Sequence, residues 1–374
     1  MENGHPRVLH LIKCLDRGGA ERLVAAMATS ADESRFQYEV AFVRSSMRGL
    51  VGEIERSGVV VHDLGARSDF DLTWAARLRR LLRQQHYEVL HAHLPYAAGI
   101  GRLVAHSLPR GRRPLIVYTE HSFWPRNQIA TRVLSRLTSP LDDVIIAVSQ
   151  STRSALPRRV RRRTRVVRHG IETQRTAAEA SRSGKVRTRL GVPPDHTLVL
   201  AVANLRPQKG YATLLAAARQ LVVAGVPVTF LAAGHGPLEG ELVRERDRLG
   251  LGERFRFLGQ RDDVPALLAA SDIFVLSSDW ECMPVAVMEA FVLGTPVVAT
   301  SVGELPHLID HGHNGLLVPP GQPTELAEAL HRLVRDAGLR RRLASAAART
   351  GEQFDVRRAR QDVEDLYAEG LRTS

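Results

Sequence analysis

One stretch of this 374-residue chain, residues 272–300, constrains the fold more than any other. It opens with the short apolar run Ile273–Leu276, which is typical of a strand buried in a parallel sheet. A polar loop follows, and Pro284 suits the first turn of a helix, where its missing N–H is not needed. We expect that helix to end at Gly294, before Val297 starts a second apolar run. This strand–loop–helix–strand order predicts an α/β fold.

Two glutamates occupy this stretch where a ligand would meet the sheet. Glu281 lies in the loop at the carboxyl end of the first strand, and Glu289 lies within the helix. Ligands of open α/β sheets bind at that edge, and a helix N-terminus there favours an anion such as a diphosphate. The neighbours of Glu289 are apolar, so we expect a buried helix whose carboxylate needs a partner. The alternative is a loop glutamate and a solvated helix glutamate without a shared role.

Length and composition indicate a two-domain globular enzyme. The polar first residues and the lack of an apolar run near ~20 residues predict neither a signal peptide nor a membrane span. Cys14 and Cys282 are the only cysteines, which is too few for a disulfide framework or a metal cluster and suits a reducing cytosol. We therefore expect a cytoplasmic protein.

Positive charge is concentrated in the first half of the chain. Residues 1–190 carry 33 Lys+Arg against 17 Asp+Glu, a net +16, whereas the remainder carries 19 against 23, a net −4. Eight arginines fall within residues 153–168, without a recognised nucleic-acid motif or stacking aromatics. We therefore expect no nucleic-acid partner, and a surface that is either solvated or attached peripherally to the anionic inner face of a membrane.

Two further strand ends carry residues suited to a phosphorylated ligand. A first strand over residues 8–12 leads into Gly18 and Gly19 at the start of a helix, where the backbone could approach a ligand closely or form a plain tight turn. A strand over residues 198–203 leads to Arg206 and Lys209 at the mouth of another helix. Two cations there would hold a diphosphate, unless they are simply surface cations.

Histidines mark two neighbouring strands of the first half. His91 and His93 alternate along an apolar strand and so share one face, but no third metal ligand is visible nearby. His121 follows the strand at residues 115–118 and is either a ligand-contacting residue or an ordinary loop histidine.

Taken in chain order, these motifs resemble the retaining family 4 glycosyltransferases. The resemblance rests on Gly-Gly-Ala-Glu at residues 18–21, Arg206 with Lys209, Gly-His-Gly-Pro at residues 234–237, and the Glu281-x7-Glu289 pair. It implies the GT-B fold, an α/β class with two Rossmann-like doubly wound domains facing a cleft. Where the family has Asn-Gly at the end of its first domain, this chain has His169-Gly170, and no role is carried onto His169.

The resemblance also implies a division of the chain. Residues 1–172 would form an N-terminal, acceptor-side Rossmann-like domain, and residues 173–196 a linker. Residues 197–352 would form the C-terminal nucleotide-sugar-binding domain, and residues 353–374 a helix that crosses back to the first domain.

The function implied is retaining transfer of a hexose from a UDP- or GDP-sugar to a hydroxyl acceptor. That acceptor would be a cell-envelope or exopolysaccharide glycan or a lipid-linked intermediate, and no metal ion or other cofactor is expected. The implied catalytic residues are Glu281, His121, Arg206 and Lys209. The implied nucleotide-sugar-binding residues are Gly18, Gly19, Arg206, Lys209, Gly234, Leu258, Glu281, Cys282, Met283, Pro284 and Glu289.

Within this set, Arg206 and Lys209 would take the charge of the departing diphosphate, and Glu289 would bind the ribose hydroxyls. Glu281 would hold sugar hydroxyls, and a role as nucleophile stays open. His121 would contact the transferred sugar. Two other functions stay open as well: a GT-B sugar-nucleotide epimerase or phosphorylase, and a basic, non-enzymatic module that binds membrane or nucleic acid.

Overall fold

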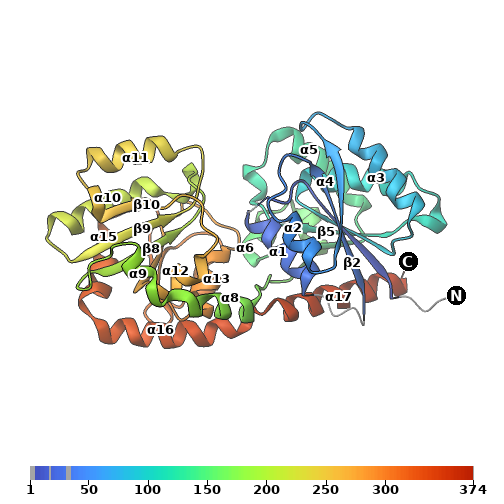
Figure 1. Cartoon of the computed structure of the whole chain (residues 1–374). Helices are drawn as coiled ribbons and strands as arrows, with labels where there is room; N and C mark the ends of the chain where they lie inside the picture. The colour runs from blue at the N-terminus through green and yellow to red at the C-terminus, as the bar shows by residue number, and fades with distance from the viewer. Residues whose placement is uncertain (1–4, 17, 31–34, 374) are drawn as a thin grey trace. The chain divides into compact units, whose positions relative to one another are not determined.

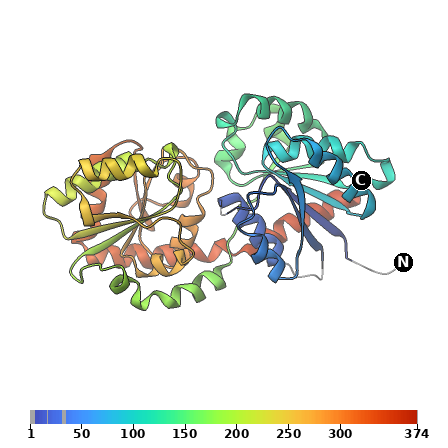
Figure 2. The same cartoon turned by 45° about the horizontal axis from the view of Figure 1, so that its top comes forward.

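The computed structural model describes residues 5–16, 18–30 and 35–373. These residues divide into two compact units, which are described separately (Figures 1 and 2). The first unit runs to Gly170 and also takes in the C-terminal segment from Val356, whereas the second unit is Ile171–Asp355. None of the described helices is both long and apolar enough to cross a membrane.

The described part of the first unit is built on a seven-stranded sheet in the order β3-β2-β1-β4-β5-β6-β7. All neighbouring strands pair in parallel, and the order reverses at β1, as in a doubly wound fold. The strands are β1 (Arg7–Ile12), β2 (Gln37–Arg44), β3 (Val60–Ala66), β4 (Val89–His93), β5 (Leu115–Glu120), β6 (Val144–Ala147) and β7 (Thr164–Val166).

Helices cover both faces of this sheet. They are α1 (Gly19–Thr29), α2 (Val51–Arg56), α3 (Thr73–Gln84), α4 (Pro95–His106), α5 (Ile129–Thr138), α6 (Gln150–Ala155), α7 (Arg158–Arg163) and α17 (Val356–Thr373). Because side chains alternate along a strand, Val8 and Ile12 of β1 pack with α1, α2 and α17, whereas Leu9 and Leu11 pack with α3 and α4. The C-terminal helix α17 is thus part of the core of the first unit.

The described part of the second unit holds a six-stranded parallel sheet in the order β10-β9-β8-β11-β12-β13. Its strands are β8 (Thr197–Val202), β9 (Val228–Ala233), β10 (Phe255–Phe257), β11 (Ile273–Leu276), β12 (Val297–Thr300) and β13 (Gly315–Val318). Its helices are α8 (Thr173–Ala180), α9 (Val186–Arg189), α10 (Tyr211–Val223), α11 (Glu239–Arg248), α12 (Val264–Ala270), α13 (Val285–Val292), α14 (Leu305–Leu308), α15 (Pro323–Arg335) and α16 (Ala337–Gly351).

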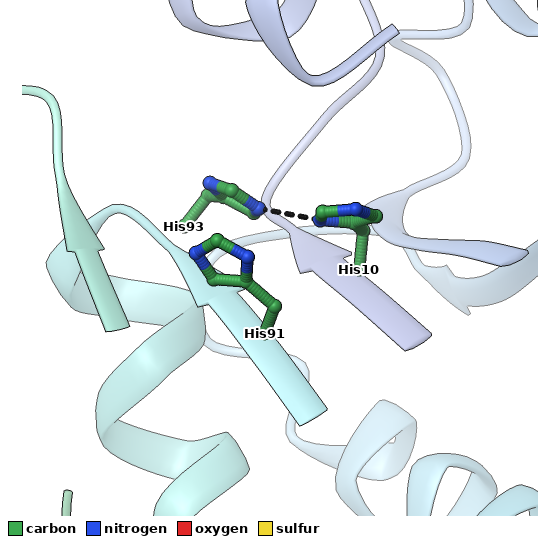
Figure 3. Close-up of side chains that lie close together, drawn as sticks. All are labelled: His10, His91 and His93. Carbon is green, nitrogen blue, oxygen red and sulfur yellow. Dashed lines mark hydrogen bonds between the residues drawn. The ribbon is translucent and has the colours of Figure 1, made fainter. Parts of the chain in front are cut away.

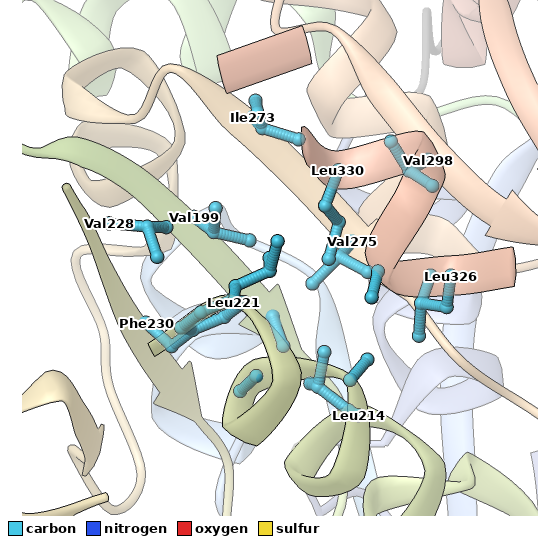
Figure 4. Close-up of a cluster of buried hydrophobic side chains, with 14 of the residues drawn as sticks. Val199, Leu214, Leu221, Val228, Phe230, Ile273, Val275, Val298, Leu326 and Leu330 are labelled. Carbon is cyan, nitrogen blue, oxygen red and sulfur yellow. The ribbon is translucent and has the colours of Figure 1, made fainter. Parts of the chain in front are cut away.

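A dense apolar core holds one face of this second sheet. Val199 of β8 and Phe230 of β9 pack against Leu214 and Leu221 of α10, and Leu330 of α15 completes the cluster (Figure 4). The packing of α10 and α15 on this face fixes the position of the strands, whose carboxyl-end loops can then carry ligand contacts.

Residues 173–196 do not form the separate linker expected from the sequence. They form α8 and α9, which pack against α12, and they belong to the second unit. Ala180, Val186 and Val192 are buried although the segment has no regular apolar spacing. Packing against a neighbouring helix, rather than local periodicity, therefore decides its structure.

A layer of histidines lies against the sheet of the first unit, on the face covered by α1 and α17. His10 of β1 stands in register beside His91 of β4, and His93 lies two residues farther along (Figure 3). His121 follows β5, and His169 follows β7. Burial lowers the pKa of all five imidazoles, to about 3 for His10 and about 4 for His169 and well below the usual value for the others. These histidines are therefore neutral in the folded protein at neutral pH.

The neutral histidine layer predicts acid sensitivity of the first unit. In the unfolded chain a histidine has a pKa of about 6.5, whereas in the folded protein these pKa values are lower. At pH values between the two, the unfolded chain binds more protons than the folded protein, so stability falls as pH falls. Each histidine should cost about 1 kcal/mol per pH unit there. Burial raises the pKa of Asp142 to about 6 and also raises that of Glu120. These two carboxyl groups make stability rise as pH falls, but they are fewer than the five histidines.

Urea unfolding at pH 7 and pH 5 checks this expectation. Trp74 and Trp124 are buried in the first unit, so a Trp280→Phe variant leaves fluorescence that reports that unit alone. The unfolding midpoint should drop by an amount that corresponds to several kcal/mol. An unchanged midpoint would show that the histidines do not stay neutral in the fold.

Candidate functional site

Two loops at the carboxyl edge of the second sheet are fastened to each other. The loop after β11 donates two hydrogen bonds to the loop after β8, from Ser277 Oγ to the carbonyl of Lys209 (3.0 Å) and from the Asp279 amide to the carbonyl of Gln208 (2.9 Å). Gly210 has a φ of +61°, and a Cβ there would lie 2.0 Å from the carbonyl oxygen of Ser277. Only glycine fits at this position, so Gly210 is needed for the two loops to lie this close together.

These loops bring Lys209 and Glu281 into an ion pair. Lys209 Nζ lies 2.6 Å from Glu281 Oε1, which also accepts a hydrogen bond from Ser278 Oγ at 2.7 Å. Glu281 is 7% exposed, so the pair is largely shielded from water. A lysine ammonium has three N–H donors, which leaves Lys209 donors for a second anionic partner.

The backbone of Glu281 is held from the other side by the turn after β12. Gly303 in that turn has a φ of +56°, and a Cβ there would lie 1.8 Å from the carbonyl oxygen of Glu281. The turn therefore packs directly against the backbone of Glu281, and any residue larger than glycine at position 303 would push the two apart.

The other residues predicted for this edge of the sheet differ in how far they are exposed to solvent. Arg206, which precedes the short turn leading to α10, is exposed. Glu289 is buried within α13, as its apolar neighbours predicted. Cys282 and Met283 are buried in the loop, and Pro284 is the residue immediately before α13.

Gly234 and Leu258 lie where the loops after β9 and β10 meet. The amide of Gly234 donates to the carbonyl of Gly259 (2.9 Å), and that of Leu258 donates to the carbonyl of Ala232 (2.8 Å). A Cβ on Gly234 would lie 2.0 Å from the carbonyl oxygen of Ala203, so this loop is pressed against the end of β8. The ends of β8, β9, β10, β11 and β12 are thus joined at one edge of the second unit.

In the first unit, Gly18 precedes α1 and Gly19 is its first residue. Arg17 of the same loop lies outside the described residues. Glu21 accepts a hydrogen bond from Cys14 Sγ at 3.1 Å, and burial together with this carboxylate raises the pKa of the thiol to about 12. Cys14 is therefore a protonated packing residue rather than a nucleophile.

His121 lies at the carboxyl end of β5, and its ring is held on two sides. Its Nε2 is 2.9 Å from Nδ1 of His93, and its ring is stacked on that of His169, with centroids 4.8 Å apart and planes at 6°. Its Nδ1 is buried and has no hydrogen-bond partner among the described residues. These contacts fix the plane of the imidazole at the end of the strand.

The structure adds a third histidine to the pair seen in the sequence. His10, on the neighbouring strand β1, brings one ring nitrogen within 4.8 Å of those of His91 and His93, a spacing that could hold a metal ion. The sequence did not show this third residue because it is more than eighty positions away and only strand register brings it close.

Ser278 and Gly303 were also missed as site residues. Their signals were weak: a serine in a polar loop, and a glycine within the turn at residues 302–306. Their contacts with Glu281 depend on how separate loops fold together, which no local pattern reveals.

A hollow in the second unit lies elsewhere. It is lined by Arg187, His196, Asp272 and Arg340 among others. Since His196 precedes β8 and Asp272 precedes β11, the hollow lies at the amino ends of these strands, opposite the edge that carries Lys209 and Glu281. It is therefore not the candidate site.

Both halves of the chain match known family descriptions. Residues 17–175 match "Glycosyltransferase Family 4", and residues 183–350 match "Glycosyl transferases group 1". Together these matches span both structural units.

Individual glycosyltransferases are also similar to this chain in sequence. The chain is 28% identical to "D-inositol 3-phosphate glycosyltransferase" of Streptomyces bingchenggensis (strain BCW-1), over 98% of this chain and 88% of that protein. It is 23% identical to "UDP-Gal:alpha-D-GlcNAc-diphosphoundecaprenol alpha-1,3-galactosyltransferase" of Escherichia coli, over 79% of each.

The structure is similar to that of HepE from Anabaena in complex with UDP and glucose. The TM-score is 0.85 at 25% identity, over 98% of this chain and 100% of HepE. The UDP-glucose complex of HepE gives a TM-score of 0.84 at 26% identity, over 99% and 100%.

These similarities confirm the GT-B fold and the enzymatic character expected from the sequence, and they exclude a non-enzymatic binding module. The two doubly wound sheets and the motif order agree with them. The chain belongs to family 4 of the retaining glycosyltransferases, enzymes that transfer a sugar from a nucleotide-sugar donor.

Proposed function

We propose that this enzyme takes a hexose from a UDP-sugar and transfers it, with retention, to a hydroxyl of a cell-envelope or exopolysaccharide glycan or of its lipid-linked intermediate. The observation that carries the proposal is the Lys209–Glu281 pair, which sets a cation with unused donors at the start of α10. HepE binding UDP and UDP-glucose supports the donor. The diphosphoundecaprenol-linked substrate named for the Escherichia coli relative supports the acceptor class.

The second unit would bind the nucleotide part of the donor. Arg206 and Lys209 face the growing negative charge of the departing diphosphate, which makes a metal ion unnecessary there. Buried Glu289 accepts hydrogen bonds from the two ribose hydroxyls, and the loops at Gly234 and Leu258 receive the base. A fixed cation of this kind stabilises the transition state more than it stabilises the bound donor.

Glu281 would orient the sugar rather than attack it. Its Oε1 accepts from both Lys209 and Ser278, and both contacts withdraw negative charge from the carboxylate. The weakened nucleophile keeps acceptor capacity for sugar hydroxyls. Retention then follows from departure and attack on the same face of the sugar, with the leaving phosphate taking the proton of the acceptor hydroxyl.

The first unit would contribute neutral groups to the transferred sugar. His121 lies at the carboxyl end of β5, and the backbone amides of Gly18 and Gly19 lie at the start of α1. Neutral donors suit hydroxyl groups, since hydroxyls carry no charge for a cation to compensate.

We further propose that α5 attaches the enzyme to the cytoplasmic face of an anionic membrane. Ile129, Val133 and Leu137 recur every fourth residue and are 77%, 51% and 73% exposed, so an apolar stripe faces outward. Arg132 and Arg136 lie beside the stripe, and the helix carries no acidic residue. An apolar stripe bordered by arginines fits the boundary between lipid headgroups and acyl chains.

Removing either cation of the second unit should slow transfer. Arg206→Ala and Lys209→Ala are each expected to lower turnover at saturating donor by ~10²-fold, because both act on charge that grows in the transition state. Lys185→Ala, which removes an exposed lysine of the same unit, should leave turnover unchanged. Turnover equal to wild type in both cation variants would move the diphosphate site elsewhere.

Glu289→Ala should weaken UDP binding by ~1–3 kcal/mol in calorimetry, an amount typical of hydrogen bonds to a charged group. In the wild type, 2′-deoxy-UDP should bind more weakly than UDP, whereas in the variant the two should bind almost equally. Glu241→Ala, on exposed α11, serves as the control. A variant that still prefers UDP by the wild-type margin would remove Glu289 from the ribose site.

Flotation with vesicles tests the membrane surface. The enzyme should float with anionic vesicles at low salt and be released by high salt, since each arginine near the surface contributes on the order of 1 kcal/mol that salt screens. The triple change Ile129→Ser, Val133→Ser, Leu137→Ser should abolish binding, and Val223→Ser, at an equally exposed apolar residue of α10, should not. Absence of binding at low salt would leave the stripe without a lipid partner.

A further inference from the structure

Three charged side chains meet at the carboxyl edge of the first sheet. Lys13 follows β1, Arg44 ends β2, and Asp69 lies in the loop after β3. Lys13 Nζ is 2.8 Å from Asp69 Oδ2, and Arg44 Nη1 is 2.6 Å from Asp69 Oδ1. These three strands are neighbours in the sheet. Their ends therefore carry two cations against a single carboxylate, and positive charge is left over.

Backbone and aromatic contacts hold the two cations in place. The carbonyl of Lys13 accepts hydrogen bonds from the amides of Val43 (3.2 Å) and Arg44 (2.9 Å). The Lys13 ammonium lies over the ring of Tyr96, 5.2 Å from its centroid, and the Tyr96 hydroxyl donates to the carbonyl of Asp69 (2.7 Å). A ligand that binds here would have to order few side chains, which lowers the cost of binding.

This group of residues lies at the point where the strand order reverses. Lys13 follows β1, and Tyr96 lies in the first turn of α4, after the neighbouring strand β4. Ligands of open α/β sheets bind at such a point. Leu94, between β4 and α4, has a φ of +66°, which no other described residue except glycine shares in sign. That backbone is unfavourable for leucine, and such strain is found preferentially at ligand sites.

Both cations can reach a ligand. The side chain of Lys13 is 31% exposed and that of Arg44 is 22% exposed. Within the part of the chain that the structure describes, each donates one hydrogen bond, to Asp69, although both groups have several N–H donors. Hydrogen bonds from Lys13 and Arg44 lower the pKa of Asp69, so its carboxylate stays ionised at neutral pH. The unused donors and the remaining positive charge suit an anion.

An exposed aromatic residue follows the carboxylate along the chain. Phe70 comes directly after Asp69 and is 94% exposed, and Leu72 is 57% exposed. A single exposed apolar residue needs no explanation by itself. Beside fixed cations, however, it supplies the apolar surface that binding sites place around a few polar groups. This edge therefore suits a ligand with an anionic group and a ring to lie against Phe70.

We propose that Lys13 and Arg44 bind a phosphate group carried by the acceptor, so that the acceptor is a sugar phosphate, either free or linked to a lipid. The proposal rests on the proposed function and deepens it by naming the acceptor class. The loop that begins at Lys13 leads to Gly18 and Gly19, whose amides are proposed to meet the transferred sugar. The charge of this phosphate does not change during transfer, so the two cations would position the acceptor rather than stabilise the transition state.

Phosphorus NMR with inorganic phosphate tests the subsite. Saturating UDP is present throughout, so that the proposed diphosphate site is filled. The full chain should bind phosphate saturably, and Lys13→Met or Arg44→Met should each weaken that binding by ~10-fold, since a charge-assisted hydrogen bond is lost. Arg110→Met, which removes an exposed arginine before β5 at the opposite edge of the sheet, is the control and should bind as wild type does. Absence of binding, or equal binding in all four proteins, would overturn the proposal.

Asp69→Asn distinguishes an anion subsite from a purely structural clasp. The variant removes the negative charge but keeps an oxygen that can accept hydrogen bonds from Lys13 and Arg44. Phosphate should then bind more tightly, because the carboxylate no longer repels it. Weaker or unchanged phosphate binding, together with a lowered melting temperature, would show that the three residues only fasten the loops.

Two phosphate esters identify the source of the phosphate. α-D-Glucose 1-phosphate represents the free form, and α-D-glucosyl farnesyl diphosphate represents the lipid-linked form. Each should displace inorganic phosphate, and uncharged methyl α-D-glucoside should not. Tighter binding of the farnesyl compound supports a lipid-linked acceptor, and equal binding supports a free one. Phe70→Ala should weaken glucose 1-phosphate binding by ~3-fold and leave inorganic phosphate binding unchanged. Failure of both esters to displace phosphate would overturn the proposal.

UDP affinity separates failure of this proposal from failure of the proposed function. Lys13→Met and Arg44→Met should bind UDP as wild type does, because the second unit would hold it, and this also shows that the variants are folded. If UDP binds but inorganic phosphate does not, the acceptor subsite is wrong and the proposed donor is unaffected. If wild-type protein does not bind UDP, the proposed function is contradicted, and the comparison of phosphate binding between wild type and variants still decides the subsite.

Discussion

The ion pair between Lys209 and Glu281 is the interaction on which the candidate donor site depends. A carboxylate as buried as Glu281 needs a partner, and Lys209 reaches it only because two strand-end loops are held together. Gly210 and Gly303 allow this approach, since a Cβ at either position would collide with the backbone of the opposing loop. The loops are thus set before any ligand arrives, and a fixed cation at a helix start costs little reorganisation when negative charge develops.

Around the transferred sugar, the first unit would use neutral groups, whereas the second unit uses charge. Four of its histidines, His10, His91, His93 and His169 of the first unit, are buried close together, and burial keeps them uncharged. Hydrogen bonds then give direction to groups that have no charge to orient them. This division suits sugar transfer in the family to which the chain belongs, because a diphosphate gains charge during the reaction whereas sugar hydroxyls only exchange hydrogen bonds.

Local patterns predicted the elements that carry the site, but not the contacts between them. The apolar run ending at Leu276 and the helix ending before Gly294 were placed within a residue or two, because burial and a left-handed glycine leave clear signals. The Lys209–Glu281 pair joins residues 72 positions apart, and the link from His10 to His93 spans 83, so both depend on strand order and register. The segment at residues 173–196 was misread as a linker because its helices are stabilised by neighbours rather than by their own spacing.

The central claim, that Lys209 binds a diphosphate, is tested most directly by a binding cycle. Calorimetry would measure the affinity of UDP and UMP for the wild type and for Lys209→Ala. If the lysine holds the second phosphate, the substitution weakens UDP binding by ~10-fold or more and leaves UMP binding almost unchanged. Equal losses for both nucleotides, or no loss for UDP, would contradict the account, because the lysine would then not recognise the diphosphate.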